Sequence, residues 1–369
     1  AGFCVEQGFY RRMLSIAFPV MLQNFITSFL NMVDTVMVGK LGETEIAAVG
    51  IANQYFFFFL MFIIGLGAGC GVFIAQFWGA KDIKNIRRIL GIGLSSGLLV
   101  AGVFMLVGYC FPVQVIAVFN REAQVLALGS SYLQIVLASY LFTGITVLLT
   151  FAHRSLGQAM MPTVISAVAL AVNAFFNYVL IFGHFGAPAL GVAGAAWATL
   201  IARVIETILL VGMTYFRKGI LAAAWHELTD FTFGFFRNAY RTIAPVIFND
   251  ICWGLASLVY SIVYGRMGTQ AVASIQICNT ITNLYLVVFF GLSNAAAVMI
   301  GNSVGAGREK LAVDYASTFV RLSFLVGISL GLLLALTSPL TLRFFNVSPQ
   351  VHHDTLLILY IVAAIFTAR

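Results

Sequence analysis

The chain has 369 residues, of which 61% are apolar and only 9% are charged, and its mean hydropathy is +0.99. This composition excludes an ordinary soluble domain and is typical of a chain with many membrane-spanning segments. The formal net charge of +7 does not indicate a nucleic-acid partner, because the Lys and Arg residues stand in short loops between apolar runs and form no solvated basic face.

Ten apolar segments follow one another along the chain, and most reach the roughly 20 residues that a spanning helix needs. The alternating pattern of a membrane barrel is absent, so helices are expected throughout, and the predicted fold class is an all-α polytopic membrane protein. The segments cover residues 13–38, 46–76, 89–117, 123–150, 162–182, 189–215, 239–264, 271–303, 312–341 and 353–368.

Loop charges predict the orientation in the membrane, because cytoplasmic loops carry an excess of Lys and Arg. Most basic residues fall on the side of the N-terminus, which is therefore expected in the cytoplasm of a multi-pass plasma-membrane protein. The connector 217–238 lies on the same side, and its stretch WHELTDF is weakly amphipathic, which is typical of a segment on the membrane surface.

An internal repeat organises the chain. With an offset of 226 residues and no gap, Pro19 falls on Pro245, Gly65 on Gly291 and Gly79 on Gly305. Six segments separate the copies, so both copies have the same topology, as in secondary transporters built from parallel repeats. Two lobes of this kind leave a cleft between them.

The repeat predicts three parts: an N-terminal lobe with six spanning segments (1–216), a cytoplasmic linker (217–238) and a C-terminal lobe with four (239–369). The second lobe stops two segments short of the first, so ten of an expected twelve are present. The chain also begins without Met, and we therefore expect a piece of a longer protein.

The first apolar segment carries a polar stripe. At about 100° per residue, Asn24, Thr27, Asn31 and Asp34 lie within roughly 80° of one another on a helix. A carboxylate inside the membrane costs about 2.5–3.5 kcal/mol at a helix centre. The stripe therefore favours a cavity-lining helix with a proton or cation site at Asp34 over a merely structural carboxylate.

Two further carboxylates fall inside apolar segments. Asp250 shares a helix face with Ser257, Tyr260, Ser261 and Tyr264, and both a functional role and a hydrogen bond between the lobes stay open for it. Glu206 follows Arg203 by three residues, so a structural ion pair within one helix is the simpler interpretation.

Side-chain amides of Asn and Gln also occur inside other apolar segments. Asn173 and Asn177 are spaced i, i+4 and share a helix face, where their carbonyl oxygens suit a neighbouring helix or a cation. Asn53 precedes a run of Phe, and the repeated segment carries Gln276 and Asn279. Aromatic and amide surfaces suit apolar organic cations as ligands, although most of the Phe residues are expected to face lipid.

The sequence shows no catalytic constellation. The cysteines at positions 4, 70, 110, 252 and 278 have no metal-ligand spacing, and the five His residues fall in loops or the linker. The glycine-rich run GLGAGCG at 65–71 lies in an apolar segment and lacks the ending of a phosphate loop, so it indicates helix packing. An enzyme is therefore not expected.

Taken together, these features resemble the multidrug and toxic compound extrusion (MATE) transporters of the multidrug/oligosaccharidyl-lipid/polysaccharide exporter superfamily. The resemblance covers essentially the whole chain. It rests on DTVMVGKLGETEIAAVG at 34–50, RSLGQAMMP at 154–162, NAFFNYVLIFG at 173–183, GVAGAAWAT at 191–199 and APVIFNDICW at 244–253.

The resemblance implies a monomer of two six-helix lobes that exports small organic, often cationic compounds through the lipid membrane in exchange for Na⁺ or H⁺. No other cofactor and no nucleic acid are implied. It places the coupling cation at Asp34, Asn173, Asn177 and Thr199, with Na⁺ at the first three. From the polar residues of the apolar segments we expect a substrate cavity at Asn24, Asn31, Asn53, Asp250, Tyr260, Gln276 and Asn279.

This chain departs from the pattern in two places. Some members have Asp where Asn177 stands, which puts proton-relay versions of the mechanism in doubt, and the stretch LLILYIVAAIF at 356–366 has no acid for a second-lobe site. Two other functions stay open. A lipid-linked oligosaccharide flippase needs a markedly cationic cavity, and only Arg203 and Arg321 are available; a membrane receptor has no support from the repeat.

Overall fold

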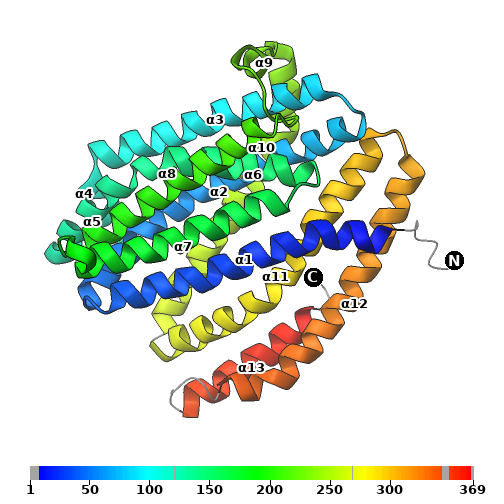
Figure 1. Cartoon of the computed structure of the whole chain (residues 1–369). Coiled ribbons are helices and arrows are strands. Elements are labelled where there is room, and N and C mark those ends of the chain that lie inside the picture. Colours follow the sequence, from blue (N-terminus) through cyan, green and yellow to red (C-terminus); the bar gives the residue numbers. More distant parts are fainter. Residues whose placement is uncertain (1–7, 120–121, 268, 343–348, 367–369) are drawn as a thin grey trace.

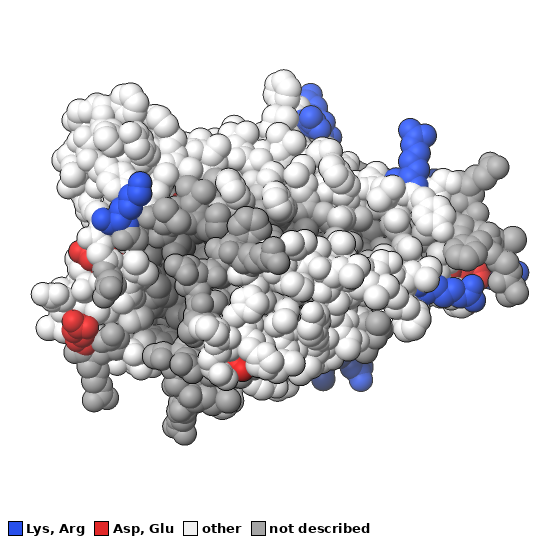
Figure 2. Space-filling view, turned by 90° about the horizontal axis from the view of Figure 1, so that it is seen from below, with Lys and Arg blue, Asp and Glu red and all other residues white. Residues whose placement is uncertain are grey.

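The computed structural model describes residues 8–119, 122–267, 269–342 and 349–366. Inside its helices, the side chains of Asn31 and Gln276 also lie outside the described part. The described chain forms long helices and no strands, and Figure 1 shows them as an elongated bundle with α1 running beside α11. On the face in Figure 2, charged side chains lie around the edge and the broad centre carries almost none.

The helices follow the apolar segments closely. They are α1 (Phe9–Gly39), α2 (Glu43–Gly79), α3 (Ile83–Cys110), α4 (Pro112–Ala117), α5 (Ala123–Val136), α6 (Ala138–Ser155), α7 (Met160–Phe182), η1 (His184–Gly186), α8 (Val192–Phe216), α9 (Trp225–Thr229), α10 (Phe233–Met267), α11 (Thr269–Gly305), α12 (Glu309–Leu342) and α13 (Pro349–Ile365).

Each of the ten predicted segments overlaps one of these helices or a broken pair of them. The segment 123–150 is expected as one helix, whereas the structure bends it by 51° between α5 and α6. The segment 89–117 is divided at Phe111 before Pro112, where proline disfavours helical geometry in the preceding residue. Of the described helices, seven are long and apolar enough to span a membrane, or eight with the bent pair; the number ten stays a prediction.

The cores show which helices belong together. The largest apolar cluster joins α2, α3, α5, α6, α7 and α8, and it also takes up Ala239 and Ile243 from the first turns of α10. A second cluster packs Phe9 and Ile16 of α1 against α11 and α12. The lead helix of each half thus begins on the core of the other half. The division into lobes at 216 and 239 stays a prediction.

Close helix crossings at glycine hold the two halves together. A Cβ placed on Gly79 of α2 would lie 2.0 Å from the carbonyl oxygen of Asn302, and one on Gly305 of α11 would lie 1.7 Å from that of Gln76. Both are impossible contacts, so only glycine lets these backbones approach so closely. Gly79 and Gly305 stand 226 residues apart, and their contacts are reciprocal.

The connector between the halves is fastened to α3. Arg87 pairs with Glu227, and Arg88 and Lys84 reach Asp230 at 2.9 and 3.4 Å. The backbone of Leu228 in α9 lies against Gly91. These ion pairs place the short helix α9 at the end of the bundle where α3 begins, and we call this the α9 end.

Candidate functional site: a polar pocket around Asp34

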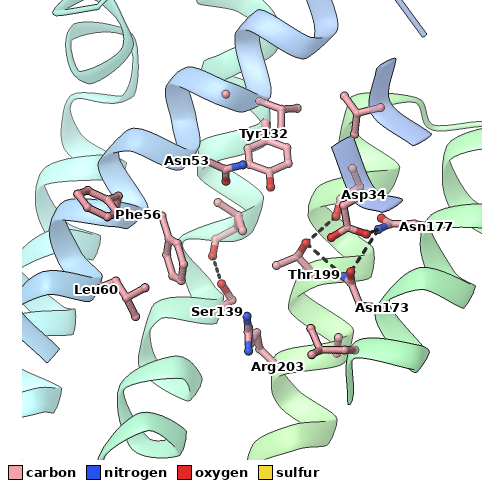
Figure 3. A pocket seen from close by; sticks show the side chains of 18 of the residues that line it. Asp34, Asn53, Phe56, Leu60, Tyr132, Ser139, Asn173, Asn177, Thr199 and Arg203 are labelled. Carbon is pink, nitrogen blue, oxygen red and sulfur yellow. Dashed lines mark hydrogen bonds between the residues drawn. The ribbon is translucent and has the colours of Figure 1, made fainter. Parts of the chain in front are cut away.

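A pocket of about 440 Å³ opens among α1, α2, α5, α6, α7 and α8. Its walls are mostly apolar, with Phe56, Phe57 and Leu60 on the α2 side, while the polar side chains gather opposite, on α1, α7 and α8 (Figure 3). Small residues of α8, such as Ala195 and Ala202, leave the space open. A mainly apolar concave site with a few convergent polar groups is the usual form of a ligand site.

Asp34 is the carboxylate of this pocket. It lies near the end of α1 and accepts a hydrogen bond of 2.6 Å at Oδ1 from Nδ2 of Asn177 on α7. Pro19 does not end α1, although proline disfavours a helix interior. The Pro19 carbonyl accepts a hydrogen bond of 3.1 Å from Thr163 of α7, which ties this part of α1 to the helix that carries Asn177.

Asn173 brings a second amide to the carboxylate, one helical turn from Asn177. As assigned, its Oδ1 accepts from Asn177 Nδ2 at 3.3 Å and its Nδ2 donates to Thr199 at 3.5 Å. In that assignment the side-chain oxygen of Asn173 faces the carboxylate oxygens of Asp34, so that two acceptors meet without a donor. With the amide turned, the nitrogen lies 2.9 Å from Oδ2 and 3.1 Å from Oδ1, which two hydrogen bonds would explain. We therefore favour the turned amide when only the protein is present.

One acceptor in the site stays unused. The Oδ1 atom of Asn177 is buried and meets no donor among the described residues. Buried polar atoms nearly always have a partner, so such an oxygen points to a missing water or ion. Together with the carboxylate of Asp34 and the turnable amide of Asn173, it offers the oxygen atoms that a hard cation prefers.

Thr199 completes the group on α8. Its hydroxyl donates to the carbonyl of Ala195 at 3.0 Å. It lies 3.5 Å from the side-chain amide of Asn173, whose nitrogen donates to it as assigned and whose oxygen faces it once the amide is turned. Tyr132 of α5 stands on the other side of the pocket and interacts with Thr199. Thus the four residues expected to bind a coupling cation, from three helices, are brought together in one place.

A second polar group adjoins the pocket one turn further along α8. Arg203 donates to Glu206 at 2.7 Å, which confirms the ion pair expected from their spacing. Glu206 is only 3% exposed, and Arg203 is 30% exposed. Both residues line the same pocket as Asp34.

A chain of hydrogen bonds leads from Glu206 toward the α9 end. Ser166 donates to Glu206 at 2.7 Å, Gln23 donates to Ser166 at 3.0 Å, and Arg154 at the end of α6 donates to Gln23 at 2.5 Å. The chain links α8, α7, α1 and α6. The sequence argument missed this connection, although Gln23 was visible as a polar residue in an apolar run.

The residues expected to line a substrate cavity are dispersed. Asn53 of α2 lines the pocket, and it also lines a second one of about 360 Å³ shared with Gln54, Phe58 and Ser257. Asn24, Asp250, Tyr260 and Asn279 border neither of these two pockets. Asn24 bonds its own helix at the Val20 carbonyl, Asp250 faces Gly65, Tyr260 and Asn279 are exposed, and the side chains of Asn31 and Gln276 lie outside the described residues.

The sequence argument also missed Tyr132 and Ser139 as lining residues. Both lie in the apolar segment 123–150 among several other hydroxyl-bearing residues, Tyr132 on α5 and Ser139 at the start of α6. In the sequence, nothing distinguishes Tyr132 and Ser139 from hydroxyl-bearing residues that are simply buried between helices.

Comparison with known proteins identifies the family to which the chain belongs. The MatE family model matches residues 19–179 and again 245–368, two segments that begin 226 positions apart. The chain is 22% identical over 347 residues to a protein of Thermotoga maritima named a probable multidrug resistance protein NorM, and 30% identical over 303 residues to one of the same name from Bradyrhizobium diazoefficiens. It covers 73% and 63% of their lengths, and these matches take in 92% and 79% of this chain.

Solved structures share the fold. An outward-facing multidrug resistance MATE transporter of the MOP superfamily superposes with a TM-score of 0.84 at 18% identity, covering 96% of this chain and 79% of that one. A variant of the Vibrio cholerae MATE transporter VcmN superposes with the same score and identity, covering 98% and 82%. The fold and the internal pocket thus define a multi-pass helical membrane transporter. The chain belongs to the MatE family.

Proposed function

We propose that this chain is the greater part of a secondary antiporter that exports organic, often cationic compounds in exchange for Na⁺ or H⁺ at Asp34. The observation that carries the proposal is the position of Asp34, a carboxylate in a largely apolar pocket with two amides and a hydroxyl around it. A carboxylate in such surroundings is stabilised by a bound cation or by a proton. The names of the multidrug relatives agree with this function.

The site offers a physical route from cation binding to substrate release. With the protein alone, the Asn173 and Asn177 amides supply NH groups to Asp34. A bound Na⁺ would instead draw the oxygens of Asn173 and Asn177 toward it. A bound proton would neutralise the Asp34 carboxylate to which those NH groups donate. Either event changes how α1 is held against α7 and α8, and it removes the negative charge that a cationic substrate would meet in the same pocket.

We place the transporter in the plasma membrane with the α9 end in the cytoplasm. Lys84, Arg87 and Arg88 stand at that end together with most of the other basic residues, as expected for cytoplasmic loops. We expect a monomer surrounded by lipid. A flippase for pyrophosphate-linked sugars is not favoured, because the one guanidinium lining the pocket, Arg203, is already paired with Glu206.

The test is transport by the full-length protein in membrane vesicles. A fluorescent organic cation serves as substrate, and gradients of Na⁺ and of pH are imposed separately. Asp34→Asn should lower the part of transport that either gradient drives by about tenfold to a hundredfold. Asp314→Asn is the matched control, because Asp314 is exposed on α12, far along the chain from the pocket. Unchanged gradient-driven transport by Asp34→Asn would overturn the proposal.

A further inference from the structure

The charges of the pocket do not balance. Among the described residues that line it, three carry charge, namely Asp34, Arg203 and Glu206. A guanidinium beside Asp34 would be the natural partner of that carboxylate, and Arg203 does act on it electrostatically. Yet the hydrogen bond of Arg203 goes to Glu206, at 2.7 Å. One positive and two negative groups leave the pocket short of one positive charge.

The hydrogen-bond chain fixes Glu206 as an anion. Arg154 can only donate, so Gln23 must turn its oxygen toward Arg154 and its nitrogen toward Ser166. Ser166, which accepts from Gln23, is then free to donate its own hydrogen to Glu206 Oε1. Arg203 donates to Oε2 of the same carboxylate. Every donor in this chain points toward Glu206, as suits an ionised carboxylate.

We infer that Glu206 reserves Asp34 for a cation from solution, by holding the guanidinium of Arg203 that would otherwise neutralise Asp34 from within the protein. The inference rests on the proposed function, because it takes Asp34 as the cation ligand. It assigns to Glu206 the role of a positioning residue: it fixes Arg203 and need not touch the cation. Asp34 is then the one carboxylate of the pocket whose charge is left for exchange.

The local geometry makes the alternative pairing accessible. Arg203 lies one turn from Thr199 on the same face of α8, and Thr199 contacts Asn173 beside Asp34. Arg203 is the more exposed partner of the pair and lines the cavity, so its long side chain has room to turn. A buried or half-buried guanidinium without a partner is costly, and after loss of Glu206 the remaining carboxylate of the pocket is Asp34.

A purely structural pair behaves differently in the single substitutions. If the pair of Arg203 and Glu206 only stabilises α8, either Glu206→Gln or Arg203→Gln alone should be damaging, because each leaves one charge without its partner. If Glu206 acts by holding Arg203, Glu206→Gln weakens cation binding whereas Arg203→Gln does not, and removing both charges restores the demand for one cation. The two explanations therefore predict opposite results for Arg203→Gln.

The experiment measures binding of radioactive Na⁺ to the purified full-length protein, repeated at several pH values so that protons compete for the same site. No drug is present, so the result is independent of substrate transport. Glu206→Gln should weaken cation binding by about tenfold or more, the effect of an opposite charge close to a carboxylate. The double variant should return to within about threefold of wild type. Arg203→Gln alone should bind at least as tightly as wild type.

Thr207→Val provides the control for a general disturbance of α8. Thr207 is buried next to Glu206 and bonds Thr146 at 2.9 Å, but it does not line the pocket. Its loss should lower the thermal unfolding temperature and leave cation binding unchanged. Should Glu206→Gln fold poorly, Arg203→Gln and the double variant still decide the matter.

The outcomes separate this inference from the proposed function. Na⁺ binding retained by Asp34→Asn would overturn the proposed function and this inference with it. A wild-type protein that binds no Na⁺ at any pH would overturn this inference and leave the proposed function only its H⁺ form. Binding that is lost in Asp34→Asn but unchanged in Glu206→Gln would overturn only the role of Glu206. A double variant that binds as weakly as Glu206→Gln, or Arg203→Gln falling to that level, would overturn it as well.

Discussion

The helices α1 and α10 begin the two segments that the family model matches, and each carries a carboxylate inside the membrane. Both have a proline near the start of the match, Pro19 and Pro245, and each crosses a partner helix at a glycine. A Cβ on Gly65 of α2 would lie 2.7 Å from the Cα of Ile247, and one on Gly291 of α11 would lie 2.3 Å from the Cγ of Met21. Met21 and Ile247 are also 226 residues apart.

Their carboxylates have quite different surroundings. Asp34 lies in the pocket with amides of α7, whereas Asp250 sits at the glycine crossing, where a Cβ on Gly65 would be 3.2 Å from its Oδ2. At the position equivalent to Asp34, α10 has Tyr260, which is 61% exposed. The comparison teaches that close backbone packing is repeated in both halves, while ion chemistry depends on neighbours that only one half supplies.

The largest effect is expected from exchanging the two carboxylates for amides separately. Asp34→Asn should lower cation-driven transport by about tenfold to a hundredfold, in line with the roughly 1.5–3 kcal/mol of a hydrogen bond to a charged group. Asp250→Asn should change it by less than about threefold, because Asp250 borders neither pocket. Initial rates in vesicles measure both. Equal losses in the two variants would remove the asymmetry between α1 and α10.

A second carboxylate beside Asp34 should increase the difference in cation coupling between the Asp34 site of α1 and the Asp250 position of α10. Asn177→Asp places a new acid about one hydrogen bond from Asp34, and two carboxylates so close cannot both stay ionised, so they share a proton. Transport driven by a pH gradient should then rise relative to transport driven by Na⁺. The ratio of the two rates measures this, with Asn249→Asp beside Asp250 as the control. An unchanged ratio would speak against direct contact of the cation with Asn177.

The reciprocal crossings should be equally intolerant of added volume. Gly305→Ala forces a methyl group into the Gln76 carbonyl and should destabilise the fold by about 1–3 kcal/mol, the usual cost of overpacking. Gly79→Ala should do the same. Gly212→Ala on α8 meets nothing within 4 Å and should be neutral or slightly stabilising. Thermal unfolding temperatures compare the three, and tolerance at only one crossing would break the pairing.

The smallest effect is expected at the connector. A backbone hydrogen bond at Ala224 and then Arg87 lower the pKa of Glu227, and hydrogen bonds from Arg88 and Lys84 lower that of Asp230. A carboxylate whose pKa is lower in the folded than in the unfolded state stabilises the folded state at pH values above its unfolded pKa. This stabilisation is lost as the pH falls through the folded-state pKa. Docking of α9 should thus be constant near pH 7 and weaken only below about pH 4.

Hydrogen exchange of α9 amides at several pH values tests this expectation. Glu227→Gln and Asp230→Asn should loosen α9 at neutral pH and remove most of the acid dependence. Glu309→Gln at the start of α12, outside these ion pairs, is the control. Protection of α9 that falls between pH 6 and pH 8 would contradict the assignment.

Sequence alone was sufficient for the class of protein and for the order of its helices, because apolar runs of this length are stable only in a membrane and hydrogen-bond their backbones as helices. It also singled out Asp34, Asn173 and Asn177, since polar groups in such runs are costly and their spacing puts them on defined faces. The ion pair of Arg203 and Glu206 followed from the same spacing rule and is confirmed.

Tertiary structure decided which of these groups meet. Spacing along one helix says nothing about the angle at which another helix crosses it, so the gathering of Asp34 with Asn177 depended on the packing of α1 against α7. Tyr132 of α5 lines the same pocket, and four helices contribute the hydrogen-bond chain from Arg154 to Glu206. Asp34 was visible as a costly carboxylate; only the packing showed that the guanidinium of Arg203 in the same pocket pairs with Glu206.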